Sequence, residues 1–162
     1  MEMLFTDSVD IVGRTPDKYE GSKLYVSTGA LDYDHIDFSQ VELTNYADKP
    51  SRANLTADIG DIIFAKMFET QKALRLDKNS AEYIFSTGFF AVRAKENIIT
   101  PECLYHLVTS EQFLSQKDKN CSGATQKAIT NAGLEKVLVN IPDIKDQPYI
   151  SDKLRRINML TA

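Results

Sequence analysis

Basic and amide side chains are the residues of this 162-residue sequence best suited to bind a ligand. Arg and Lys neutralise phosphate groups, and Gln or Asn can form paired hydrogen bonds with an adenine edge. The stretch Gly-Ala-Thr-Gln-Lys at 123–127 combines a flexible glycine, a hydroxyl, an amide and a cation, which suits a loop that contacts a nucleic-acid groove. A plain surface position is the alternative for each candidate. The candidate DNA contacts are Arg52, Lys66, Lys72, Arg75, Lys117, Lys119, Thr125, Gln126 and Lys127.

Motifs that mark common enzyme sites are missing from the sequence. It has no P-loop, no G-x-G-x-x-G, no H-E-x-x-H and no G-x-S-x-G. Cys103 and His106 lie three residues apart in a predicted helix, where helix packing explains them without catalysis. Residues 32–37, Asp-Tyr-Asp-His-Ile-Asp, offer oxygen ligands for a hard metal, but their spacing matches no EF-hand loop. We therefore predict no catalytic residue and no metal site, and interpret residues 32–37 as a solvated acidic loop.

Charge is distributed unevenly along the chain, whose net charge is −4. Residues 1–65 carry five basic and twelve acidic side chains, whereas residues 66–128 carry nine and seven. An acidic first third and a mildly basic remainder permit a local phosphate-binding face. A solvated surface of mixed charge would give the same counts, so the charge pattern alone does not establish such a face.

Length and composition predict one soluble domain, or one domain with an arm. Apolar residues make up 43% and charged residues 26% of the sequence, which is ordinary for a globular protein. Neither a signal peptide nor an apolar run long enough to cross a bilayer is evident. Cys103 and Cys121 are far apart in sequence, so free thiols in a reducing compartment are expected. These features together predict a cytoplasmic protein.

Hydrophobic patterning predicts strands in the middle of the chain. The segment at 62–68, Ile-Ile-Phe-Ala-Lys-Met-Phe, begins with β-branched and aromatic residues after a Gly-Asp turn. The segment at 82–95 has two apolar halves around Ser-Thr-Gly, which indicates two strands separated by a kink. A second Ser-Thr-Gly triplet at 27–29 follows a shorter β-rich run. We interpret both triplets as turns at strand ends.

Helix signals concentrate in the second half of the chain. Thr100 and Pro101 suit the start of a helix over residues 99–116, and Ser110 suits the cap of a second one. Thr130 suits the cap of a short helix before an apolar strand at 137–141. Strands and helices mix without regular alternation, which favours an α+β fold with a twisted mixed β-sheet and flanking short helices. A C-terminal helix stub is predicted to pack through Ile150, Leu154, Ile157 and Leu160.

Four stretches, in their order along the chain, resemble the specificity subunits of type I restriction-modification systems. They are GDIIFAKM, STGFFAVRAK, LYHLVTSEQF and GATQKAITNAGLEKVLVNIPDI. They are similar to the Gly-Asp-Ile strand, the following apolar strand, the Tyr-rich helix with Ser-x-x-Phe and the Gly-x-Thr-Gln-Lys loop of that family. Residues 11–31 also resemble its opening loop and strand, whereas Ile144 replaces the second proline of its I-P-x-P pattern. The resemblance extends roughly from Asp10 to Asn158.

The resemblance implies a target recognition domain at 1–148 and the start of a spacer or dimerisation helix at 149–162. Such a domain reads part of a double-stranded DNA site and has no catalysis or cofactor of its own. Its implied partners are a methyltransferase subunit, which binds S-adenosylmethionine, and a restriction subunit. Family subunits usually carry two recognition domains, and this chain has room for one. A half-subunit that dimerises, a truncated gene product and a piece of a longer chain all remain open.

A second hypothesis is a protein-interaction or regulatory module that keeps the same fold without reading DNA. The acidic first third and the net charge of −4 favour this alternative. Target bases are not expected to be readable from residue types, because base readout also depends on loop geometry.

Overall fold

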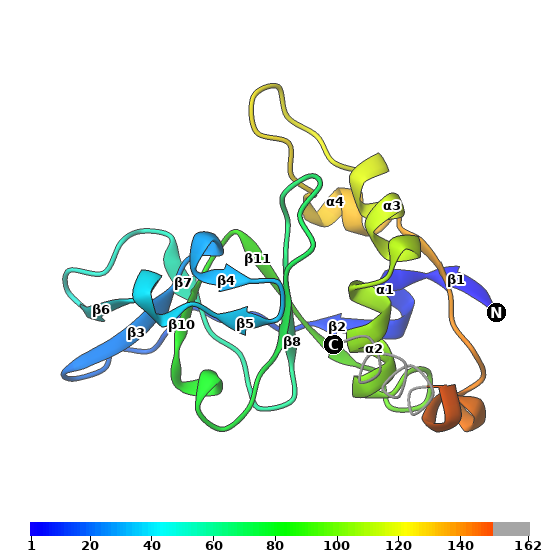
Figure 1. The fold of residues 1–162 in the computed structure, drawn as a ribbon, viewed down its shortest axis with the longest axis horizontal. Helices are drawn as coiled ribbons and strands as arrows, with labels where there is room; N and C mark the ends of the chain where they lie inside the picture. Colours follow the sequence, from blue (N-terminus) through cyan, green and yellow to red (C-terminus); the bar gives the residue numbers. More distant parts are fainter. Residues whose placement is uncertain (151–162) are drawn as a thin grey trace.

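The computed structural model describes residues 1–150 and is built around a central antiparallel sheet. Its strands, in order, are β2 (Val9–Ile11), β11 (Phe89–Ala94), β8 (Ile62–Ala65) and β9 (Ala73–Arg75). Both faces of this sheet are buried, which explains why β8 and most of β11 are continuous apolar runs rather than alternating ones. The central sheet lies between an outer sheet at one end of the molecule and the helices at the other (Figure 1).

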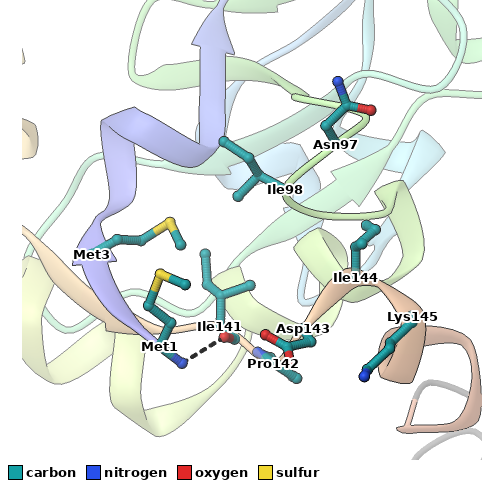
Figure 2. Close-up of a pocket in the computed structure, with 9 residues that line it drawn as sticks. All are labelled: Met1, Met3, Asn97, Ile98, Ile141, Pro142, Asp143, Ile144 and Lys145. Carbon is teal, nitrogen blue, oxygen red and sulfur yellow. Dashed lines mark hydrogen bonds between the residues drawn. The ribbon is translucent and has the colours of Figure 1, made fainter.

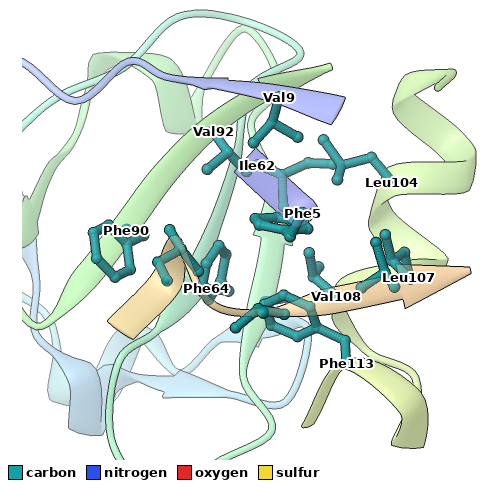
Figure 3. Packing of buried hydrophobic residues seen from close by; sticks show 14 of the residues in the cluster. Phe5, Val9, Ile62, Phe64, Phe90, Val92, Leu104, Leu107, Val108 and Phe113 are labelled. Carbon is teal, nitrogen blue, oxygen red and sulfur yellow. The ribbon is translucent and has the colours of Figure 1, made fainter. Parts of the chain in front are cut away.

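One face of the central sheet packs against the helices. This side contains α1 (Phe5–Ser8), α2 (Pro101–Val108), α3 (Glu111–Lys119), α4 (Asn131–Leu134) and the ribbon of β1 (Glu2–Leu4) with β12 (Leu138–Asn140). Three aromatic rings form the centre of its core (Figure 3). The Phe113 ring centroid lies 4.8 Å from that of Phe5 and 5.2 Å from that of Phe64. This packing fixes α3 on the central sheet.

The opposite face packs against the outer sheet, whose order is β6-β3-β10-β7. Along β8, Ile62 and Phe64 face the helices whereas Ile63 and Ala65 face this second core. Strands β3 and β10 are parallel, and a short β4–β5 hairpin completes this side. The remaining bounds are β3 (Ser22–Val26), β4 (Leu31–Asp32), β5 (His35–Ile36), β6 (Glu42–Asn45), β7 (Ala53–Leu55), β10 (Ile84–Ser86) and the 3₁₀ helices Thr28–Ala30, Phe38–Gln40, Ser80–Glu82 and Ile144–Asp146.

The predicted α+β class is confirmed, and so are the three predicted helix caps. The Thr100, Ser110 and Thr130 hydroxyls accept hydrogen bonds from the third backbone N–H beyond each of them. The strand predicted over 62–68 ends at Ala65, because the chain turns away there and Glu69 adopts a left-handed φ of 56°. The strands are also divided among two four-stranded sheets and two ribbons rather than joined in one sheet.

The predicted C-terminal helix begins within the described residues, since residues 147–150 are helical. Ile150 is half-buried, and Leu154, Ile157 and Leu160 lie outside the described residues, as does most of the segment at 149–162. Within residues 1–150, no helix is both long enough and apolar enough to cross a bilayer.

Candidate nucleic-acid interface

Two loops that are distant in sequence project together from one edge of the molecule (Figure 1). One, residues 66–72, joins β8 to β9, and the other, residues 120–130, joins α3 to α4. The Phe68 N–H donates to the Lys127 carbonyl at 3.0 Å, and the Ile129 N–H donates to the Lys66 carbonyl at 2.9 Å. We call residues 66–72 the strand loop and residues 120–130 the tip loop.

The Gly-Ala-Thr-Gln-Lys stretch forms the end of the tip loop. Ser122 and Ala128 exchange two backbone hydrogen bonds of 3.0 and 3.1 Å and so close the loop beneath it. Gly123 has a φ of 120°, and a Cβ atom there would lie 2.6 Å from the Gln126 carbonyl oxygen, so the turn requires glycine. The side chains of residues 124–127 are exposed. A hydroxyl, an amide and an ammonium are therefore presented together to solvent by a closed loop.

Three cations, Lys66, Lys72 and Lys127, belong to these loops, and Arg52 lies near Lys66. We call these four residues the basic cluster. The Lys66 ammonium lies 4.4 Å from the centroid of the Phe90 ring, and the Lys127 ammonium lies 5.2 Å from that of Phe68. Burial, and then the positive charge of Arg52, lower the pKa of Lys66. Sequence analysis missed both aromatic rings, because nothing in the sequence shows which lysine each one supports.

The two Ser-Thr-Gly triplets help to place Arg52 and Lys72. Val26 pairs with Phe85 in the parallel β3–β10 register, so both triplets lie at strand ends, as predicted, and those ends are neighbours. A Cβ on Gly88 would lie 2.8 Å from Cγ2 of Thr28 and 3.2 Å from Nη2 of Arg52, so the guanidinium lies close against this turn. The Lys72 ammonium donates to the Thr28 carbonyl at 2.7 Å. Two of the four cations, Arg52 and Lys72, therefore lie against these turns.

The basic cluster is not neutralised by carboxylates. Ion pairs of Arg14 and Arg93 with Asp58 and Asp61, at 2.7–2.9 Å, gather at the other end of the central sheet. Among residues 1–150, no carboxylate forms an ion pair with the basic cluster. Like charges held close together without counter-charges create a positive potential, which favours an anionic ligand.

The other three predicted DNA contacts lie outside the basic cluster, and the prediction for Lys117 is wrong. Lys117 is 1% exposed and its ammonium donates to three backbone carbonyls, so it is not available to a phosphate. Arg75 is exposed but pairs with Ile62, about 13 Å along β8 from Lys66 at 3.3 Å per residue. Lys119 is exposed in the last turn of α3, and no described hydrogen bond or ion pair joins it to the basic cluster.

An apolar groove of about 510 Å³ lies on the helical side (Figure 2). Methionine and isoleucine side chains dominate it, and its charged side chains are those of Asp143 and Lys145. The Gln147 side chain, fully buried, ties the adjoining segments together through hydrogen bonds with Thr100, Ile98 and Pro142. Its apolar lining does not suit a phosphate backbone. The lining residues are Met1, Met3, Asn97, Ile98, Ile141, Pro142, Asp143, Ile144 and Lys145.

The residues considered as a metal site and as a nucleophile do not form such sites in the described chain. His35 lies 3.6 Å from Asp32 and 3.3 Å from Asp34 on the exposed β4–β5 hairpin. No group of three or more potential ligands in the described chain could hold a metal ion. Burial, and then the neighbouring Glu102, raise the pKa of the Cys103 thiol, which opposes formation of a nucleophilic thiolate.

Comparison with known proteins gives one consistent family. The model of the type I restriction modification DNA specificity domain matches residues 18–161. The HindI type I restriction enzyme specificity subunit of Haemophilus influenzae is 28% identical over 133 residues, which are 80% of this chain and 28% of that subunit.

Solved structures share the fold. The HsdS subunit of Thermoanaerobacter tengcongensis superposes with a TM-score of 0.76 at 22% identity, over 97% of this chain and 41% of that one. A structure described as the basis of complex assembly and conformational transition of the type I R-M system gives 0.81 at 23% identity, over 98% and 42%. This chain therefore spans well under half the length of each of these relatives.

Proposed function

The chain belongs to the family of type I restriction-modification DNA specificity domains, and on that premise we propose that it recognises a specific sequence in double-stranded DNA. The observation that carries the proposal is the basic cluster, which lies without carboxylate partners beside the exposed end of the tip loop. A duplex has a regular array of phosphates that such a cluster can neutralise.

The two parts of the surface suit different contacts. Arg52 lies close to Gly88, Lys66 lies over the Phe90 ring and Lys72 donates to the Thr28 carbonyl, so the three cations lie near the body of the domain and suit backbone phosphates, which fix orientation. Thr125 and Gln126 are exposed at the end of a projecting loop, and their hydroxyl and amide can reach base edges in a groove. Lys127 follows Gln126 in the tip loop, and its ammonium lies over the Phe68 ring of the strand loop.

The chain acts, in this proposal, as one recognition unit of a specificity subunit. The matched part of the chain covers 28% of the curated relative and about two fifths of the solved subunits, which leaves room for a second unit in a full assembly. The unit directs a methyltransferase subunit and a restriction subunit to the site. It is not catalytic itself, and S-adenosylmethionine binds to the methyltransferase partner. The alternative of an interaction module that does not read DNA is favoured only by the acidic first third and the net charge of −4, and nothing in the comparisons with known proteins supports it.

Co-expression with a methyltransferase subunit encoded beside the chain tests this proposal. The purified complex is incubated with S-adenosylmethionine and a random-sequence duplex library, and methylated positions are mapped by sequencing. We expect one defined methylated motif, and its loss when Gln126→Ala and Lys127→Gln are combined. A stable complex that methylates no motif would contradict the proposed recognition.

A further inference from the structure

Lys117 occupies a position in α3 where an apolar residue would be expected. Phe113 and Lys117 are four residues apart, so they share the helix face that packs on the central sheet, and they are 0% and 1% exposed. The apolar stem of a lysine can pack in such a place, but its ammonium must then find acceptors inside the protein. The pKa of Lys117 is lowered, and burial is the largest cause of this shift.

The ammonium is fully satisfied by backbone oxygens. It donates to the carbonyls of Ala65 at 3.1 Å, Met67 at 3.0 Å and Thr70 at 2.8 Å, which uses all three of its protons. No described carboxylate forms an ion pair with it. A buried charge of this kind is a poor source of stability, since an apolar residue of similar volume is often as good or better. The role of Lys117 therefore depends on the segments whose carbonyls its ammonium binds.

The three acceptors belong to the end of β8 and to the strand loop. The next residue, Asp118, accepts a hydrogen bond of 3.0 Å from the Glu69 N–H, at the left-handed turn of the same loop. The last turn of α3 thus holds the strand loop by three hydrogen bonds and the end of β8 by a fourth, and the strand loop in turn pairs with the tip loop through Phe68 and Ile129. Lys117 lies at the base of both loops of the candidate interface.

We infer that Lys117 is a positioning residue for DNA recognition: its ammonium holds the strand loop, and through it the tip loop, in the arrangement that reads the target. This inference rests on the proposed function. Lys117 does not touch DNA, so its loss loosens the loops without removing a phosphate contact. The expected consequence is reduced discrimination between sequences with little change in the salt dependence of binding.

Hydrogen exchange on the free protein tests the positioning without DNA. In Lys117→Met, which keeps the volume and removes the donors, we expect the Phe68 and Ile129 amides to exchange at least tenfold faster. The amides of Arg14 and Thr56, which bond to each other at the other end of the central sheet, should keep their rates. Lys119→Met is the matched control on the exposed side of α3. If Lys117→Met does not fold, Asp118→Ala removes the hydrogen bond from the Glu69 N–H and should loosen the same amides. Unchanged rates for the loop amides would overturn the inference.

Methylation by the complex with the methyltransferase subunit tests whether loss of Lys117 reduces discrimination between sequences. For Lys117→Met we expect at least a tenfold fall in the ratio of methylation at the target motif to methylation at sites with one mismatch. The salt dependence of binding to a random-sequence duplex should not change. A purely structural role would lower the melting temperature and leave the ratio intact, and that result would overturn the inference. If the wild-type complex shows no motif, the proposed function fails, while the exchange rates still decide whether Lys117 positions the loops.

Discussion

Removal of one cation from the basic cluster should change the salt dependence of DNA binding by a calculable amount. Lys127→Gln removes the charge and keeps a polar side chain at the exposed end of the tip loop. Each lysine or arginine that neutralises a phosphate contributes about −0.9 to the slope of log affinity against log salt concentration. If all four cations of the basic cluster contact phosphates, the slope is about −3.6, and affinity falls roughly 150-fold between 50 and 200 mM salt.

Loss of the Lys127 contact should reduce that slope to about −2.7. The affinity of the variant would then fall roughly 40-fold over the same salt range, a difference of about 3.5-fold from the wild-type chain. The assay is fluorescence anisotropy of a labelled 30-bp random-sequence duplex, titrated with the full chain at several salt concentrations. Arg75→Gln is the matched control, because Arg75 is exposed at the opposite end of β8.

The slopes of these two variants show whether phosphate attraction is confined to the basic cluster. Equal slopes for Lys127→Gln and the wild-type chain would show that Lys127 contacts no phosphate. An equal reduction by Arg75→Gln would show that the attraction is not confined to the basic cluster. Either result would contradict the proposal that the basic cluster binds phosphates because it lacks carboxylate partners.

Three further predictions concern stability and loop shape. Phe113→Ala should cost about 3–5 kcal/mol and lower the melting temperature by roughly 6–20 °C, because Phe113 is fully buried among aromatic rings; exposed Phe38→Ala should change it little, and circular dichroism measures both. Gly123→Ala should weaken binding to a random duplex by about five- to thirtyfold, because about 1–2 kcal/mol of strain enters at a φ of 120°; affinity within twofold of wild type would count against the loop's role. Burial, then the negative charge of Asp34, raise the pKa of Tyr105 to about 12, so its contribution to stability is full below pH 10 and is lost as pH rises through 12. Urea unfolding should therefore show a smaller loss between pH 9 and 11.5 for Tyr105→Phe than for the wild-type chain, and an equal loss would contradict the assignment.

Local signals in the sequence were sufficient for the elements whose formation depends on neighbouring residues. Thr100, Ser110 and Thr130 cap helices because a hydroxyl beside the first turn meets a free N–H whatever the rest of the fold does. The apolar halves around Ser86 became β10 and β11, because β-branched and aromatic residues fill both cores.

Tertiary contacts determined what the sequence could not show. Lys117 has the same residue type as an exposed phosphate ligand, and only the packing of α3 on the end of β8 reveals that it is buried. Arg52 and Lys66 are fourteen positions apart. The antiparallel pairing of β8 with β11 brings Gly88 to Lys66, and the pairing of β7 with β10 brings Arg52 to Gly88. The division of strands between two sheets likewise depends on pairings between distant residues.

Hydrogen exchange of the full chain with and without a random-sequence 30-bp duplex at low salt tests most directly whether this surface binds DNA. We predict that DNA slows exchange in peptides that cover the strand loop and the tip loop. Peptides that line the apolar groove, at residues 1–4 and 141–145, should exchange at the same rate in both samples. Protection of the apolar groove with none at the two loops would contradict the assignment of the interface, and protection nowhere would contradict DNA binding by this chain.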